Sequence, residues 1–157
     1  MSYILNGNTV AFEYDADELF EACALKSAYL SRRVKDTEGR YAGEELVLTK
    51  DEREAFDRCL QECVSGVWGY VGKMCLEGSE GVDRESEIVF KMPVGKGGER
   101  TLKIVDAGFF ELLVTGVLGG WFKLCGEMNL SSMYEQGFVA SARILWNDLF
   151  PLRDRGE

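Results

Sequence analysis

Residues 106–126, DAGFFELLVTGVLGGWFKLCG, decide the fold of this chain. The stretch is apolar almost all the way round a helix, and within it only Glu111 and Lys123 interrupt the apolar pattern after Asp106. Spanning a bilayer takes about 20 predominantly apolar residues with few charges, so a buried helix is favoured over a membrane span. We therefore expect a helix over 106–125 at the centre of a helical bundle.

Two segments before this stretch have the spacing of amphipathic helices. Residues 16–35 carry apolar side chains at three- and four-residue steps. Thr49-Lys50-Asp51-Glu52 is a capping box, in which the side chains of the first and last residues each bind the other's backbone amide. Apolar residues then recur at the same steps for about seven turns. The patterns predict helices over 16–35 and 50–76.

A fourth helix is predicted after the central stretch. Ser132-Met133-Tyr134-Glu135 is a second capping box, and Pro151 ends the segment that follows. One stripe of that segment holds Phe138, Ala142, Leu145 and Leu149. With this helix over 132–149, the sequence predicts a mainly α fold, a four-helix bundle, in a single domain over residues 1–157.

Two short hairpins are expected beside the helices. Asn6-Gly7 lies between β-favouring residues and suits a type I′ turn, which predicts a hairpin over 3–12. Residues 86–92 and 101–105 could form a second hairpin over 86–105, with the glycine-rich segment 93–100 as a flexible connection. A lone hairpin is marginal in water, so the second one, isolated from the first in the sequence, must pack on helices or on another chain.

Charge and composition exclude several classes of function. The chain has 157 residues, with 18 Lys and Arg against 27 Asp and Glu, a formal net charge of −9. An acidic surface disfavours nucleic acid and anionic membranes as partners. Because the chain has no histidine, Ser-His-Asp and Cys-His catalysis and His-ligated metals are excluded.

The cysteines and the first residues indicate a cytoplasmic protein. Five cysteines are scattered through apolar segments, which is typical of reduced core thiols. Cys59-x3-Cys63 could be a metal or redox pair, but no second close pair accompanies it. Residues 1–7 have neither the basic start nor the apolar run of a secretory signal.

Two clusters of carboxylates are explained by helix stability and need no catalytic or metal-binding role. They lie at the predicted starts of the first two helices, where negative charge complements the helix dipole; their members are Asp15, Asp17, Glu18, Glu21, Asp51, Glu52 and Glu54. We expect no catalytic residue, no cofactor and no metal, and therefore not an enzyme. A carboxylate and metal enzyme stays as a remote alternative.

One segment is basic within this acidic chain. Lys91, Lys96, Arg100 and Lys103 fall within thirteen residues. Such a segment is often a solvated loop. The alternative is an arm that docks on the acidic face of a partner or of a neighbouring copy, where complementary charge fixes the register. These four residues are the candidate protein-interaction residues.

Four segments of the chain resemble a known kind of protein. They are residues 19–29 (LFEACALKSAY), 48–53 (LTKDER), 112–121 (LLVTGVLGGW) and 146–153 (WNDLFPLR). They are similar to small helical proteins encoded in prophages of gut Bacteroides-type bacteria, which are taken to be virion structural or head-tail assembly components. The resemblance implies a phage or prophage origin, in the host cytoplasm or in the virion, and offers no catalytic residues.

The function expected from these observations is structural. We expect a non-enzymatic assembly protein that acts through protein–protein contacts and oligomerisation, with protein partners or other copies of itself, and with neither nucleic acid nor a membrane. The alternative is a small regulatory or ligand-binding helical module. Its pocket would lie between the helices and be lined by Phe109, Phe110, Trp121 and Trp146.

Overall fold

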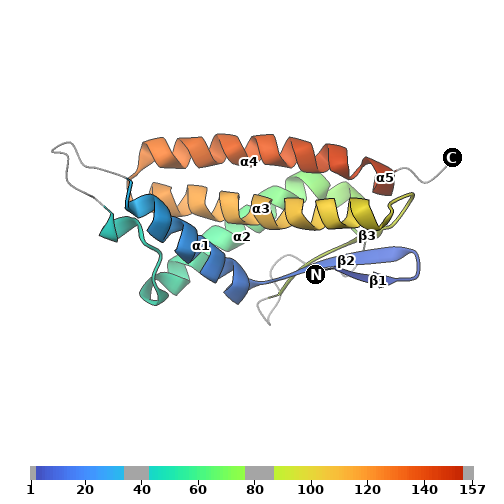
Figure 1. Cartoon of the computed structure of the whole chain (residues 1–157), viewed down its shortest axis with the longest axis horizontal. Coiled ribbons are helices and arrows are strands. Elements are labelled where there is room, and N and C mark those ends of the chain that lie inside the picture. Colours follow the sequence, from blue (N-terminus) through green and yellow to red (C-terminus); the bar gives the residue numbers. More distant parts are fainter. Residues whose placement is uncertain (1–2, 34–42, 77–86, 154–157) are drawn as a thin grey trace.

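Figure 1 shows the computed structural model, which describes residues 3–33, 43–76 and 87–153. The main elements are β1 (Tyr3–Asn6), β2 (Thr9–Asp15), α1 (Ala16–Ser31), α2 (Arg53–Val71), β3 (Glu87–Pro93), α3 (Glu99–Leu124), α4 (Met128–Asp148) and α5 (Phe150–Arg153). Short 3-10 turns lie at Glu44–Leu46, Lys50–Glu52 and Gly72–Met74. The described residues are mainly helical, with one small antiparallel sheet.

Helix α3 is the centre of the core, as its composition predicts. The side chains of Leu112, Leu113, Val117 and Leu118 have no exposed surface, although they point in different directions around the helix. Helices α1, α2 and α4 and the sheet all pack on α3 (Figure 1). Burying each such side chain stabilises the fold by about 1.5–3 kcal/mol.

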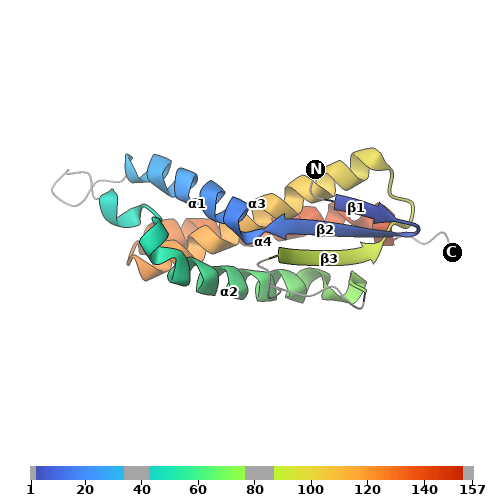
Figure 2. The same ribbon diagram turned by 90° about the horizontal axis from the view of Figure 1, so that it is seen from below.

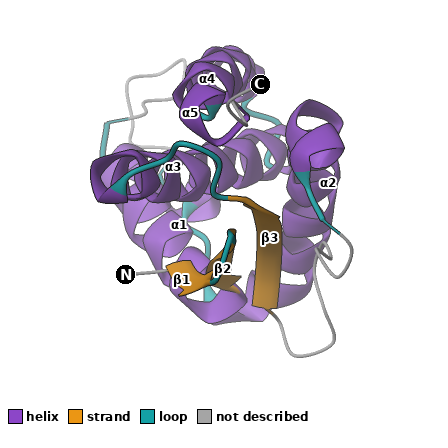
Figure 3. Cartoon of the chain, turned by 90° about the vertical axis from the view of Figure 1, so that its right-hand side faces the viewer, coloured by secondary structure: helices purple, strands orange, loops and turns teal. Residues whose placement is uncertain are grey.

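The three strands form one sheet in the order β1-β2-β3, antiparallel throughout. Alternate residues of β2 and β3 face the helices, so the partners Phe12 and Phe90 are both fully buried. Phe90 stacks on Phe109 of α3 with 4.7 Å between ring centroids, and Phe12 lies 5.3 Å from the same ring. Figures 2 and 3 show the sheet lying under α3, with α2 alongside β3.

The first capping box forms as predicted. The Thr49 amide donates to the Glu52 carboxylate at 2.9 Å, and the Thr49 side chain contacts the same carboxylate. The predicted helix over 50–76 is present as α2 with a 3-10 turn at each end. The first hairpin, predicted over 3–12, is also present, and its second strand continues to Asp15.

The second predicted hairpin is wrong. Strand β3 pairs with β2, so the three strands make a single sheet, and residues 99–105 form the first turns of α3. Leu102 and Val105 are buried while Lys103 and Ile104 are exposed, a spacing that continues the helical stripe to Phe109. A strand at 101–105 would have exposed alternate residues instead.

The prediction that residues 132–135 form a capping box at the start of the fourth helix is also wrong. Helix α4 begins at Met128, so residues 132–135 lie inside it. The chain turns sharply at Gly126, which has a φ of +80°. The Glu127 amide donates to the Phe122 carbonyl at 2.9 Å, a bond typical of a glycine-ended helix. Ser131, placed in the first turn, donates its hydroxyl to the Gly119 carbonyl at 2.9 Å.

The four-helix bundle is not confirmed beyond its mainly helical class. Helices α2 and α4 lie along α3, but α1 ends at Ser31 and packs beside the middle of α3, near Glu111 and Val114. The sheet covers the part of α3 around Phe109. Of the rest of the predicted first helix, residues 32–33 form a turn and residues 34–35 lie outside the described residues. Among those residues, no helix has the length and hydropathy to cross a bilayer.

Candidate functional site

The four basic residues proposed from sequence lie at one end of the molecule. Lys91 is near the end of β3, Lys96 is in the connection to α3, and Arg100 and Lys103 are in the first turns of α3. All four are exposed. The Lys103 ammonium pairs with the Glu99 carboxylate, one turn earlier, at 3.3 Å.

The connection that carries Lys96 is fixed rather than flexible, contrary to the prediction for 93–100. The Lys96 amide donates to the Pro151 carbonyl at 2.8 Å, and the Val94 amide donates to the Asn8 carbonyl at 2.8 Å. Gly95 has a φ of +57° and lies against the backbone of Leu152. The basic segment is therefore held to the body of this chain and is no free arm.

The acidic cluster at the start of α1 is joined to α2 by Arg53. The guanidinium donates to Asp17 at 2.7 Å and to Asp57 at 3.1 Å. It also lies over the rings of Phe20 and Phe56, 5.2 and 5.4 Å from their centroids. Arg53 thus holds the starts of α1 and α2 together.

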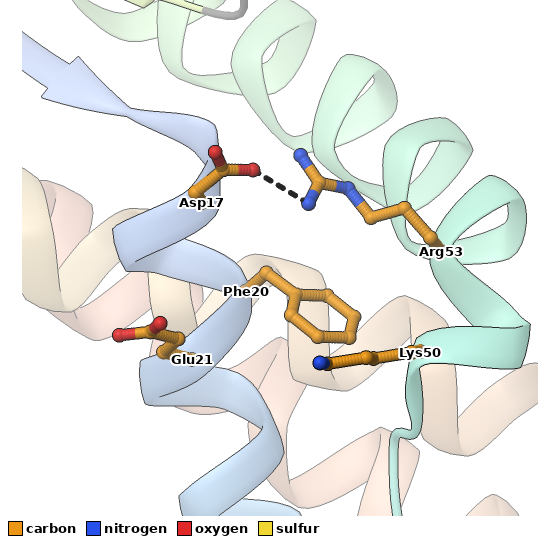
Figure 4. A pocket seen from close by; sticks show the side chains of 5 residues that line it. All are labelled: Asp17, Phe20, Glu21, Lys50 and Arg53. Carbon is orange, nitrogen blue, oxygen red and sulfur yellow. Dashed lines mark hydrogen bonds and ion pairs between the residues drawn. The ribbon is translucent and has the colours of Figure 1, made fainter.

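A hollow of about 410 Å³ lies beside this arginine, lined by Asp17, Phe20, Glu21, Lys50 and Arg53 (Figure 4). The Arg53 guanidinium is paired with Asp17 and Asp57, so much of its positive charge is already balanced by these two carboxylates. Within the part of the chain that the structure describes, no three His, Cys, Asp or Glu side chains are grouped to hold a metal. We assign the hollow no ligand.

Two cysteines of α2, Cys59 and Cys63, are unsuited to nucleophilic chemistry near neutral pH. Burial raises the pKa of Cys63 to about 12, and its thiol lies 3.5 Å from the Leu113 carbonyl, which accepts from it. Burial likewise raises the pKa of Cys59 to about 11, with the Glu62 carboxylate adding to the shift. A thiol reacts as its thiolate, so these two groups are inert near neutral pH.

The four aromatic residues proposed as one pocket do not come together. Phe109 is fully buried against the sheet, whereas Trp121 lies twelve residues, about 18 Å, further along α3. The Trp121 indole donates to the Leu46 carbonyl at 2.8 Å. Phe110 packs near Tyr14, and Trp146 is a half-buried residue of α4. Phe109 and Phe110 thus both lie beside Tyr14, whereas Trp121 bonds to Leu46 and shares no pocket with these two phenylalanines.

A groove of about 350 Å³ does lie between α2, α3 and α4. Its floor is formed by small residues, including Gly66, Gly116 and Gly120, and by Cys59 and Cys63. Phe138 of α4 fits over the two helices here, 3.5 Å from where a side chain on Gly66 would begin. The glycines admit this ring, which is why α4 can pack closely.

The outer face of α4 is a surface that the sequence analysis missed. Helix α4 lies along α3 at one edge of the molecule (Figure 3) and buries Ser131, Ala142 and Leu145. On the opposite side, Met133 and Ile144 are 55% and 61% exposed. Within 128–148 the charged residues are Glu135, Arg143 and Asp148, in a chain that is 29% charged. The small number of charged residues in this predicted helix was the feature of the sequence that could have indicated this surface.

Comparisons with known proteins add no further constraint on the site. No protein-family model, no curated protein and no solved structure matches the chain.

Proposed function

We propose that this chain is a non-enzymatic structural or assembly protein that acts through protein–protein contacts, with the outer face of α4 as its principal contact surface. One observation carries the proposal: an outer helix of 21 residues exposes large apolar side chains and few charges. Large apolar side chains that gather on one exposed helix, with few charges among them, favour a site of protein contact.

The chemistry of the described residues favours contact over catalysis. The acidic clusters stabilise helix starts, Arg53 is engaged by Asp17 and Asp57, and burial holds the thiols in their neutral form. The basic residues around Lys96 extend the proposed contact surface at the end of the molecule where α4 finishes, because the Lys96 amide bonds to Pro151. An origin in a phage or prophage, with the chain in the host cytoplasm or the virion, is proposed on the sequence resemblance alone.

Photo-crosslinking in cells that carry the chain tests this proposal. A photoreactive amino acid at Ile144 should give a discrete, stoichiometric crosslinked product. The same amino acid at Arg58, an exposed position on α2, is the matched control and should give little product. Equal yields at the two positions, or no discrete product from Ile144, would contradict a contact role for α4.

A ligand-binding module is the second candidate, supported by the groove between α2, α3 and α4. Its volume of about 350 Å³ is at the lower end of the range for small-molecule sites. An apolar dye such as anilinonaphthalene sulfonate would then bind with a single saturable site. Val139→Trp at the groove rim should block that site. A dye that binds weakly and equally to both proteins would exclude this candidate.

A further inference from the structure

Thr115 of α3 differs from the buried serines of the described residues. It is 6% exposed, and its hydroxyl has no hydrogen-bond partner within the part of the chain that the structure describes. The buried hydroxyls of Ser27, Ser31 and Ser131 each donate to a backbone carbonyl, at 2.9, 2.7 and 2.9 Å. A buried hydroxyl that has lost its bonds to water without gaining others is rare, and it points to a bound molecule.

Thr115 lines a shallow hollow of about 190 Å³ between α1, α3 and α4. Gly137 of α4 lines it too, and a side chain there would begin 3.6 Å from the Thr115 methyl carbon. The missing side chain of Gly137 therefore leaves room beside Thr115. Because small-molecule sites usually measure about 300–1,000 Å³, this hollow has room for one small ring.

The other walls of the hollow are largely polar. Ser141 of α4 adds a second hydroxyl that has no partner among the described residues. The Lys26 ammonium of α1 and the Glu111 carboxylate of α3 lie 3.7 Å apart, too far for a hydrogen bond, so one can still donate and the other accept. Met133 and the ring of Tyr134 supply apolar surface. The hollow thus offers donors and acceptors from three helices without a net charge.

Charge and hydrogen bonding select the class of ligand. An anion would meet the Glu111 carboxylate in a chain with a net charge of −9, and a cation would meet the Lys26 ammonium. A purely apolar molecule would leave the Thr115 hydroxyl without a partner. A neutral molecule rich in hydroxyls remains, because each hydroxyl both donates and accepts.

A sugar ring has the arrangement of groups that these walls require. Two of its neighbouring hydroxyls can accept a hydrogen bond from Lys26 and donate one to Glu111. Another hydroxyl can reach Thr115 or Ser141 in the same hollow. The C–H groups of the ring suit the apolar surface of Met133.

We propose that this hollow binds one neutral sugar ring through Lys26, Glu111, Thr115 and Ser141. The inference goes beyond the proposed contact role, and its test does not involve Ile144. The site is shallow and makes few hydrogen bonds, so the sugar should bind weakly and dissociate rapidly.

Saturation-transfer NMR with glucose, galactose and mannose tests the proposal, and at least one of them should give a saturable signal. Thr115→Val keeps the shape of the side chain and removes its hydroxyl. Since that hydroxyl has no partner in the described chain, the variant should unfold at the wild-type temperature or above it. It should nevertheless bind the sugar about fivefold or more weakly, the loss expected for one hydrogen bond.

Thr101→Val is the matched control, because it is the same substitution on the same helix, outside the hollow. It should leave sugar binding unchanged. Gly137→Ala should weaken binding, since its methyl group takes space beside Thr115. Glucuronate, which adds a carboxylate to the glucose ring, should bind more weakly than glucose.

A free sugar and the terminal sugar of a glycan share this chemistry, and methyl glycosides distinguish them. Equal binding of the sugar and its methyl glycoside indicates a glycan, because the anomeric oxygen then lies outside the hollow. Loss of binding on methylation indicates a free sugar. The inference is overturned if none of the three sugars gives a saturable signal, or if Thr115→Val and Thr101→Val bind the sugar alike. A crystal structure grown with the sugar that holds only ordered water on Thr115 also overturns it.

Discussion

Gly95 fixes the loop between β3 and α3 by two separate constraints. Its φ of +57° is one that L residues with side chains rarely adopt, and a Cβ there would lie 2.5 Å from the Leu152 carbonyl oxygen. Gly95→Ala should therefore lower the free energy of unfolding by more than the roughly 1–3 kcal/mol that left-handed strain alone costs. Urea denaturation at neutral pH measures the loss.

Gly7 offers the matched control for this substitution. It has a φ of +61° and no atom within 4 Å of the place a side chain would take. Gly7→Ala should cost the strain alone, so its loss should be the smaller of the two. Equal losses would mean that the loop moves away from Leu152 without cost, and that the docking of the loop is weak.

Arg53 shows how much one planar cation can join. Arg53→Lys keeps the charge but loses the two-sided hydrogen bonding to Asp17 and Asp57 and much of the contact with Phe20 and Phe56. Thermal unfolding should show a loss of about 1 kcal/mol, the sum expected for half-exposed pairs and ring contacts. Arg58→Lys, at a looser pair with Glu54, should show almost none. If both variants unfold alike, Arg53 is not the link we describe.

At the scale of elements, two helical glycines lie in opposite surroundings. Gly69 of α2 has no atom within 4 Å of the position that a Cβ would occupy, so Gly69→Ala should stabilise the protein by about 0.5–1 kcal/mol through helix propensity. Gly116 of α3 is where a side chain would overlap the Cys63 sulfur and the Phe138 ring. Gly116→Ala should destabilise it by about 1–3 kcal/mol. Chemical denaturation of both variants measures the difference in sign.

A double-mutant cycle locates the cause at Gly116. Cys63→Ala removes the sulfur that the new methyl group would meet. The combined Gly116→Ala and Cys63→Ala variant should therefore lose less stability than the two single losses added together, since residues in contact are coupled. Simple additivity would show that α2 and α3 do not press together at this point.

The sequence predicts the central part of α3 correctly and the second hairpin wrongly, because the two segments differ in the length of their patterns. The apolar residues of 106–125 leave a helix no exposed side, so it has to be buried. The run Leu102-Lys103-Ile104-Val105 fits a strand as well as a helix, because a short run does not separate the two periods. Buried Leu102 and Val105 settle it through their contacts with the core, which no local pattern contains.

The surroundings of the candidate site residues could not be predicted from the local sequence, for similar reasons. The four basic residues are exposed as expected, but the bond from Lys96 to Pro151 joins parts of the chain far apart in sequence. Helix α4 carries two apolar stripes, one through Phe138 and one through Met133. Which of them faces the body depends on the space that Gly66 and Gly116 leave for Phe138.

At the scale of the whole molecule, buried thiols make the free energy of unfolding decrease as pH rises into the alkaline range. Burial raises the pKa of Cys23 and of Cys63 to about 12 from 9.0. Above pH 9 the unfolded chain releases these protons while the folded chain keeps them, so stability falls as pH rises through this window. Each thiol contributes a slope of up to about 1.4 kcal/mol per pH unit. Urea titrations under reducing conditions from pH 7 to pH 10 measure it.

Cys23→Ala provides the comparison for the alkaline effect. The variant should be less stable at pH 7, because it leaves a small cavity in the core, but should lose less stability between pH 9 and pH 10. Tyr14, whose pKa burial and Asp106 also raise, adds to the loss only at higher pH. A wild-type free energy of unfolding that stays constant from pH 8 to pH 10 would refute the assignment.

The contacts among Asn8, Val94 and Pro151 also order the events of folding. The Val94 amide bonds to the Asn8 carbonyl and the Lys96 amide bonds to the Pro151 carbonyl. Three segments that are synthesised at different times therefore meet at one end of the molecule. Contacts between distant segments form slowly, because much chain must be restrained before they are made. The hairpin therefore gains its bond to Val94 only after residues far beyond it have been synthesised. A ribosome stalled before Pro151 would hold a nascent chain in which the bond between Lys96 and Pro151 has not formed.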